Sequence, residues 1–129
     1  MSATKDIVIV GAGPVGAMWA AYLGQRGHRV RGVERREDSR KTGGAVGRSS
    51  NLALSHRGFK ALDGIGAGTL VRGEGIPMRG RFIHDADGST HLQPYGEADQ
   101  AIYSVSRGEL NMRLVSHAEA HENVSFHFE

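Results

Sequence analysis

The 129-residue sequence contains no cysteine, three prolines, one tryptophan and a formal net charge of only +2. Without cysteine, a disulfide framework, a thiolate metal site and a cysteine nucleophile are excluded. The small net charge gives no indication of a nucleic-acid partner, because such partners select strongly basic surfaces.

Long apolar runs are also missing. The longest, residues 17–23, is far shorter than the roughly 20 residues that cross a membrane. The apolar segment Ile7–Val10 lies between Asp6 and Gly11, which does not match a signal peptide. We therefore expect a cytoplasmic protein with no membrane segment in this stretch.

Glycine is abundant, with 19 residues, and its first cluster separates two different patterns. Ile7–Val10 is a β-branched run typical of a strand buried on both faces. A helical pattern begins at Val15 and stops at Gly27, and Arg29–Glu34 indicates a second strand. Strand, helix and strand in this order predict a right-handed parallel unit, hence an α/β, Rossmann-like fold.

The middle of the chain is less regular. Residues 35–50 predict an extended loop, and Ser55 is a candidate N-cap for a helix that ends at Gly66. Residues 81–85 and 90–93 flank Asp87-Gly88, which indicates a β-hairpin with a two-residue turn.

The last third predicts strand, helix and strand. Residues 101–105 are a short strand candidate, and Ser106 with Glu109 forms a capping-box pattern. The helix that follows carries an apolar stripe, and residues 124–128 again read as a strand. The stripe consists of Leu110, Leu114 and Ala118.

The first glycine cluster matches the dinucleotide fingerprint G-x-G-x-x-G in its expected setting, between a strand and a helix. Gly11 permits the tight turn, Gly13 lets a pyrophosphate approach, and Gly16 lets the helix pack on the strand. Glu34 lies eighteen residues after Gly16 and would accept hydrogen bonds from ribose hydroxyls. The predicted contacts of the nucleotide with this turn are Gly11, Ala12, Gly13, Val15 and Gly16.

The fingerprint leaves the choice of dinucleotide open. Glu34 argues against a ribose 2′-phosphate, because two anions would meet. Arg35 and Arg36 argue the other way, since they could hold that phosphate. FAD, NAD and NADP therefore all remain candidates at this point.

Several downstream segments resemble the FAD-dependent aromatic hydroxylases and, within them, the branch that acts on L-kynurenine. The resemblance covers essentially the whole chain. Besides the fingerprint, the matching segments are residues 47–55, 76–79, 81–85, 94–96, 103–107 and 109–111.

The resemblance implies a bound FAD, NADPH as co-substrate, and transfer of oxygen from O2 to an aromatic ring by the flavin rather than by a protein nucleophile. It implies that Arg48, Ala53 and Arg107 lie against FAD, and that Arg81 and Tyr95 hold the amino-acid end of L-kynurenine. We add Arg35 to the cofactor contacts. We predict no catalytic side chain within these residues.

Two placements support these roles on physical grounds. A two-residue turn puts Arg81 opposite Pro94, and a one-residue slip puts it opposite Tyr95; either pairing would form a clamp for a carboxylate. Arg107 lies in the first turn of a helix, where a cation is unfavourable unless an anionic ligand offsets the helix dipole.

The histidines could in principle form a metal-binding site, but we do not favour this interpretation. His117 and His121 stand four apart on a predicted helix, a spacing compatible with metal ligands. No third ligand accompanies them in the sequence pattern, so a polar helix face is the better interpretation and no metal is expected.

We expect residues 1–129 to be the N-terminal part of an FAD-binding domain, with an incomplete fold. Residues 1–71 and 101–129 would form the Rossmann-like core, and residues 72–100 a hairpin that contributes to the substrate site. The resembled enzymes are several hundred residues long and carry a branched apolar residue where this chain has Ser50. The chain alone is therefore expected to be marginally stable and inactive, with a missing C-terminal half.

Three other functions remain open. One is a related hydroxylase of another aromatic acid with the same flavin site. A second is a non-catalytic remnant that keeps only the dinucleotide turn. A third is a nicotinamide-dependent reductase in which Arg35 and Arg36 select NADPH.

Overall fold

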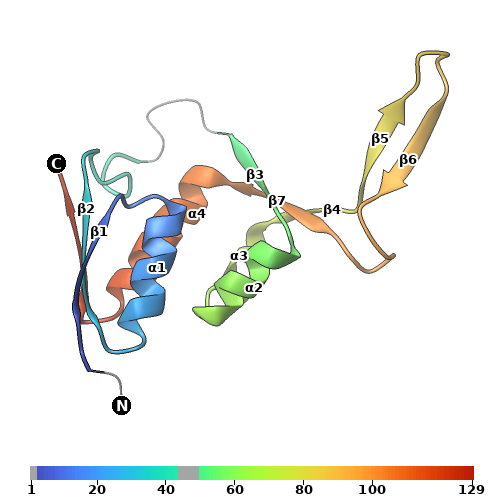
Figure 1. Ribbon diagram of the computed structural model, residues 1–129. Coiled ribbons are helices and arrows are strands. Elements are labelled where there is room, and N and C mark those ends of the chain that lie inside the picture. The colour runs from blue at the N-terminus through green and yellow to red at the C-terminus, as the bar shows by residue number, and fades with distance from the viewer. Residues whose placement is uncertain (1–2, 44–49) are drawn as a thin grey trace.

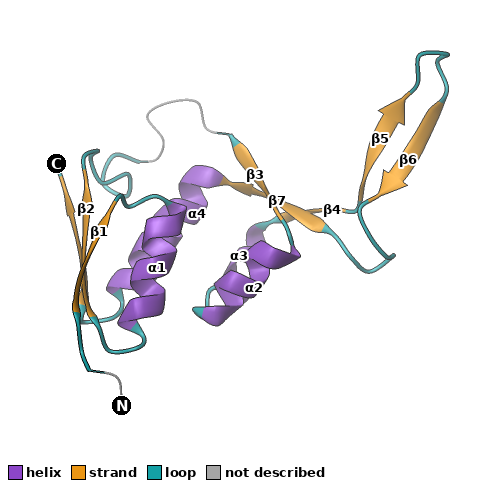
Figure 2. Ribbon diagram, viewed as in Figure 1, coloured by secondary structure: helices purple, strands orange, loops and turns teal. Residues whose placement is uncertain are grey.

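A computed structural model describes residues 3–43 and 50–129. A helix-covered parallel sheet lies at one end of the molecule, a second small sheet lies in the middle, and a β-hairpin projects at the other end (Figure 1). The helices pack between the parallel sheet and the middle sheet (Figure 2).

The parallel sheet contains β1 (Asp6–Val10), β2 (Arg29–Glu34) and β8 (Val124–Phe128) in the order β1-β2-β8. The first and second of these strands are joined by α1 (Pro14–Gly24), and α4 (Arg107–Glu119) leads into β8. The predicted α/β fold class and the predicted strand–helix–strand unit are confirmed.

Small residues bring the two long helices together on one face of this sheet. Ala17, Ala20 and Ala21 of α1 are fully buried, as is Ala118 of α4, so the helix axes can approach closely. Leu114 fills the same interface and is 1% exposed. The predicted stripe on α4 is therefore the side that enters the core.

The expectation that the first strand is buried on both faces was wrong. Ile7 and Ile9 are partly buried, but Val8 and Val10 are 65% and 87% exposed. The reason is that α1 and α4 cover one face of the sheet, and β1 is an edge strand in the order observed. Alternate residues of a strand face opposite sides, so only one set reaches the core.

The middle sheet is antiparallel and has the order β3-β7-β4. Its strands are β3 (Asn51–Leu54), β7 (Ile102–Ser106) and β4 (Ile76–Met78). The sequence predicted the region of β7 but neither β3 nor β4. Both are three or four residues long, and each depends on β7, which lies far away in the sequence, for its hydrogen bonds.

Two short helices, α2 (His56–Gly64) and α3 (Gly68–Glu74), lie beside this sheet. The predicted helix after Ser55 is confirmed as α2; Ser55 occupies the N-cap position but makes no side-chain capping bond. Gly66, with φ of +75°, follows the helix as expected of a stop. The sequence did not predict α3, because a helix with glycine at its ends and interior has weak intrinsic propensity.

The start of α4 follows the predicted capping pattern. Ser106 is the N-cap, and its Oγ accepts a hydrogen bond from the backbone N–H of Glu109 at 3.4 Å. This bond satisfies one of the N–H groups that have no partner within the helix.

The predicted hairpin exists as β5 (Gly80–His84) and β6 (Thr90–Pro94), but its two-residue turn was wrong. Strand pairing ends at His84 and Thr90, so residues 85–89 form a longer loop. The Asp87 carboxylate accepts bonds from the backbone N–H and hydroxyl of Ser89, at 2.9 and 2.6 Å. These bonds stabilise an Asx-type turn, which shifts the register by one residue from that of a two-residue turn.

Candidate functional site

The glycine-rich turn joins β1 to α1 with little room to spare. Gly11 has φ of +102°, and its N–H donates to the Val33 carbonyl at 2.7 Å. A Cβ added to Gly16 would lie 2.0 Å from the Gly11 carbonyl oxygen, so no other residue fits there. The first glycine therefore supplies the backbone conformation and the third supplies the close packing of helix on strand, as the fingerprint predicts.

The same turn is open on its outer side. A Cβ placed on Gly11 or Gly13 would meet no atom within 4 Å. Gly13 is the N-cap of α1, and the first helical turn carries no acidic side chain. An anionic diphosphate can thus approach the backbone N–H groups at the positive end of the helix.

Glu34 stands at the end of β2 and closes this site from the side. Its Oε2 accepts a hydrogen bond from the Ala12 N–H at 3.0 Å, and its side chain is 9% exposed. The Arg36 Nε and backbone N–H both donate to Oε1 at 3.1 Å. These bonds, that of the Arg36 side chain above all, lower the pKa of Glu34 to about 2 although burial opposes the shift.

This pairing bears on the choice of dinucleotide. Arg36, which the sequence offered as a ligand for a 2′-phosphate, is bound to Glu34. The ionised carboxylate faces the turn, where it suits free ribose hydroxyls and repels a phosphate on the ribose. Arg35 is exposed beside this pair. The geometry therefore favours FAD or NAD over NADP at this turn.

A second charged network, which the sequence pattern did not predict, stabilises the loop that follows β2. Asp38 is 7% exposed, and the Arg40 Nη2 lies 2.7 Å from its Oδ2. Arg40 Nη1 also lies 2.7 Å from Glu119 Oε2, and the other oxygen of Glu119 accepts the Phe126 N–H at 2.9 Å. The ion pair with Arg40 lowers the pKa of Asp38. Because Glu119 is far from Arg40 in sequence, no local pattern indicated this contact.

The predicted flavin contacts downstream lie on adjoining elements. Arg107 is the first residue of α4, which begins at the same end of the molecule as α1 (Figure 1). Ala53 lies in β3 and pairs with Ser104 of β7, the strand that runs directly into α4. Arg48 lies outside the described residues.

Val15 lies on the exposed side of α1. It is 71% exposed and borders an apolar groove of about 300 Å3 between α1 and α2. Trp19 and Tyr22 line the same groove and stack edge to face at 5.5 Å.

Arg81 and Tyr95 lie on the projecting hairpin, away from the glycine turn (Figure 1). Arg81 is opposite Gln93, and neither predicted pairing, with Pro94 or directly with Tyr95, occurs. The Tyr95 N–H donates to the Arg79 carbonyl at 2.9 Å, which continues the same register. Arg81 and Tyr95 are therefore diagonal neighbours on one face of the hairpin.

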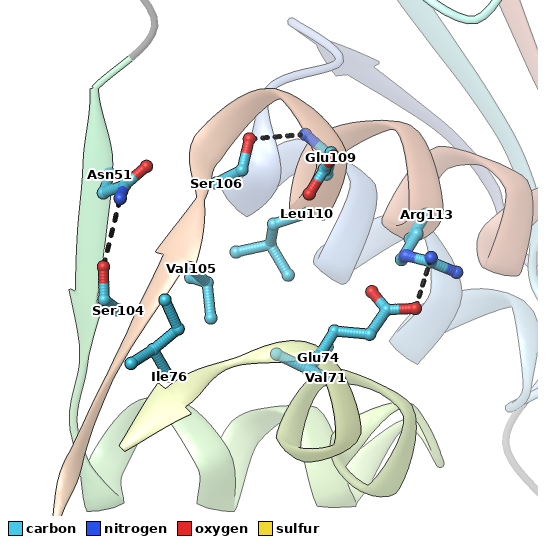
Figure 3. Close-up of a pocket in the computed structure, with 10 residues that line it drawn as sticks. All are labelled: Asn51, Val71, Glu74, Ile76, Ser104, Val105, Ser106, Glu109, Leu110 and Arg113. Carbon is cyan, nitrogen blue, oxygen red and sulfur yellow. Dashed lines mark hydrogen bonds and ion pairs between the residues drawn. The ribbon is translucent and has the colours of Figure 1, made fainter. Parts of the chain in front are cut away.

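A cavity of about 200 Å3 with a mixed polar and apolar lining lies between the middle sheet, α3 and the start of α4 (Figure 3). Two pairs of its polar side chains are bound to each other: Glu74 with Arg113, and Asn51 with Ser104 at 3.1 Å. The cavity is too small for a dinucleotide.

Within residues 3–43 and 50–129 there is no group of three or more potential metal ligands. His117 Nε2 lies 2.5 Å from the Ile65 carbonyl oxygen, which gives this histidine a structural partner. In the same described part of the chain, no helix has the length and apolar character required to span a membrane.

The strand, the open glycine turn and the carboxylate define a dinucleotide-binding protein of the α/β class. The chain belongs to the FAD binding domain family, whose profile matches residues 4–129. It is 47% identical over 127 residues to a kynurenine 3-monooxygenase of Salinispora arenicola, covering 97% of this chain and 28% of that protein. It is 45% identical over 124 residues to a kynurenine 3-monooxygenase of Anopheles gambiae, covering 95% of this chain and 26% of that protein.

Solved structures share the fold at lower sequence identity. The tetrameric form of 2-methyl-3-hydroxypyridine-5-carboxylic acid oxygenase matches with a TM-score of 0.78 at 21% identity, over 98% of this chain and 32% of that chain. The p-nitrophenol 4-monooxygenase of Pseudomonas putida matches with a TM-score of 0.74 at 20% identity, over 99% and 31%. The chain thus spans about a quarter to a third of the proteins that it matches.

Proposed function

We propose that residues 1–129 form the N-terminal part of an FAD-dependent monooxygenase that converts L-kynurenine to 3-hydroxykynurenine with NADPH and O2. The observation that carries this proposal is the identity of 42–47% to kynurenine 3-monooxygenases over 95–100% of the chain. The resemblance to these enzymes therefore extends over nearly the whole chain and is not limited to the glycine fingerprint.

The glycine turn would hold the ADP half of FAD. The diphosphate would lie over Gly11 and Gly13 at the N-terminus of α1, where added atoms meet open space. Glu34 would accept bonds from the ribose hydroxyls, because its low pKa keeps it ionised at neutral pH. We also assign contacts with FAD to Ala12, Val15, Gly16 and Arg35.

The remaining flavin contacts of the proposal are Arg48, Ala53 and Arg107. Arg107 would lie against the cofactor from the start of α4, where an anionic ligand offsets the cost of a cation near a helix N-terminus. The bound flavin would supply the oxygen chemistry, and the chain would position and shield it.

We propose that the hairpin contributes to the substrate site. Arg81 and Tyr95 share a face of the hairpin and would bind the amino-acid end of L-kynurenine. Residues 72–100 would then be the substrate-binding part, and residues 1–71 and 101–129 the cofactor-binding core. The projection of β5 and β6 away from α1 supports this division (Figure 2).

The test uses the full-length protein that carries this chain. We expect it to purify with yellow flavin and to oxidise NADPH faster when L-kynurenine is added, with 3-hydroxykynurenine as the product. Flavin binding with a response to a different aromatic acid would instead support a related hydroxylase. A colourless protein that ignores added FAD would contradict the proposal.

Two further outcomes separate the remaining alternatives. Flavin retained without any substrate response would indicate a binding remnant, and binding of NADPH without flavin would indicate a reductase. A cytoplasmic location belongs to the same proposal, because the reaction draws on the cell's NADPH; fluorescence of the tagged full-length protein would test it.

A further inference from the structure

Arg81 makes a side-chain hydrogen bond that the sequence pattern does not predict. Its Nε donates to Gln93 Oε1 at 2.6 Å, across the directly paired position of β5 and β6. The guanidinium group has five N–H donors, arranged in two edges that each fit a carboxylate with two bonds. One edge consists of Nε and one Nη, and the other consists of both Nη groups.

The bond to Gln93 removes one of these edges from use. With Nε occupied, a carboxylate can be held by two parallel bonds only at the end of the side chain, through both Nη groups. We propose that Gln93 is a positioning residue that presents Arg81 end-on to the α-carboxylate of the substrate. This inference rests on the proposed function, because it takes the ligand of Arg81 to be an amino acid.

The neighbourhood of this pair fits the inference. Tyr95 follows β6 directly, two residues after Gln93, and its N–H bond to the Arg79 carbonyl continues the register of the hairpin. Its side chain is therefore on the same face as Arg81. Glutamine is also a neutral acceptor, which fixes the guanidinium without cancelling the charge that attracts a carboxylate. A glutamate at position 93 would hold Arg81 equally well but would neutralise it.

The hydrogen bond between Arg81 and Gln93 is expected to contribute to substrate binding rather than to the stability of the fold. Arg81 and Gln93 are both exposed on the hairpin, where such a bond adds little to stability. Its effect lies in preorganisation, because a side chain already fixed in one orientation loses less entropy when the ligand binds.

The experiment compares Gln93→Met with the parent in the full-length enzyme, using L-kynurenine and kynurenamine, the analogue that lacks the α-carboxylate. We expect KM for L-kynurenine to rise about tenfold with kcat and flavin content nearly unchanged. KM for kynurenamine should stay the same. In an Arg81→Met background, Gln93→Met should add nothing further, because the two residues act as one unit.

Thr90→Val is the matched control. Thr90 pairs with His84 at the other end of the hairpin, and its side chain is on the opposite face of the hairpin from Arg81 and Gln93. It should leave both KM values unchanged. An unchanged KM for L-kynurenine in Gln93→Met, or an equal rise for both substrates, would overturn the role of Gln93 while the proposed function stands. If the parent enzyme itself does not respond to L-kynurenine, the proposed function and this inference fail together.

Discussion

The two ends of this molecule are built differently. At the α1 end, helices and parallel strands bury a core, and Glu34 is fixed by both Ala12 and Arg36. At the hairpin end, Phe82 and Leu92 face each other and are each 61% exposed. The α1 end, which we propose holds the cofactor and call the cofactor end, thus has its geometry fixed within this chain. The hairpin instead presents surface that its own strands do not cover.

The largest loss of stability is expected where α1 packs against the turn that follows β1, at Gly16. Gly16→Ala would place a Cβ 2.0 Å from the Gly11 carbonyl oxygen, and we expect a loss of about 3 kcal/mol or more in unfolding free energy. Urea unfolding of the full-length protein that carries this chain, followed by circular dichroism, would measure this loss.

Gly13→Ala is the matched control for that variant. Gly13 has φ of −70° and open space around it, so the fold should be retained. FAD should nevertheless bind at least about tenfold more weakly, because the new methyl group occupies the approach of the diphosphate. A Gly16→Ala variant as stable as the parent would show that the turn is not as tight as described.

A smaller loss of unfolding free energy is expected when the ion-pair network of Asp38, Arg40 and Glu119 is broken. Arg40→Met would leave Asp38 buried and unpaired, which should lower the unfolding free energy by about 2 kcal/mol. Arg29→Met is the control, because the pair of Arg29 with Asp6 is 70% and 74% exposed and should contribute less than about 1 kcal/mol. Equal losses in both variants, measured by urea unfolding, would contradict a structural role for the network.

The pairing of Glu34 with Arg36 gives a pH-dependent prediction. The pKa of Glu34 is lowered from 4.5 to about 2 in the fold, so its contribution is present above pH 4.5 and is lost as pH falls towards 2. Arg36→Ala should cost about 1.5 kcal/mol at pH 7, less than the full shift implies because Arg36 is 71% exposed.

The difference in stability between parent and Arg36→Ala should narrow as pH is lowered from 5 to 3, a window that follows from the lowered pKa of Glu34. Urea unfolding at several pH values would measure it, with Arg35→Ala as the control that keeps the parent's pH dependence. A difference that stays constant across this window would mean that Arg36 does not control the ionisation of Glu34.

The smallest effect is expected in the hairpin. Phe82→Ala should change the unfolding free energy of the chain by less than about 0.5 kcal/mol, because the ring is mostly exposed. Phe59→Ala, at a ring that is 4% exposed, should cost about 3 kcal/mol. Comparable losses of unfolding free energy in the two variants would contradict the difference described between the buried core and the exposed hairpin.

The sequence by itself determined the cofactor end. The β-branched run of β1, the three glycines and the acidic end of β2 act over short distances in the chain, so local pattern and backbone conformation specify them. Helix α4 and its cap followed in the same way from Ser106 and the apolar stripe.

Tertiary structure decided the partners of the charged side chains and the strand register. Arg36 has the same local sequence whether it binds a phosphate or Glu34, and Arg40 meets Glu119 only after α4 has packed. The hairpin register depends on the bonds of Asp87 in the loop, and with it the pairing of Arg81 with Gln93. The contacts of Arg40 with Glu119 and of Arg81 with Gln93 join residues that are far apart in the chain, and for that reason local sequence patterns do not contain them.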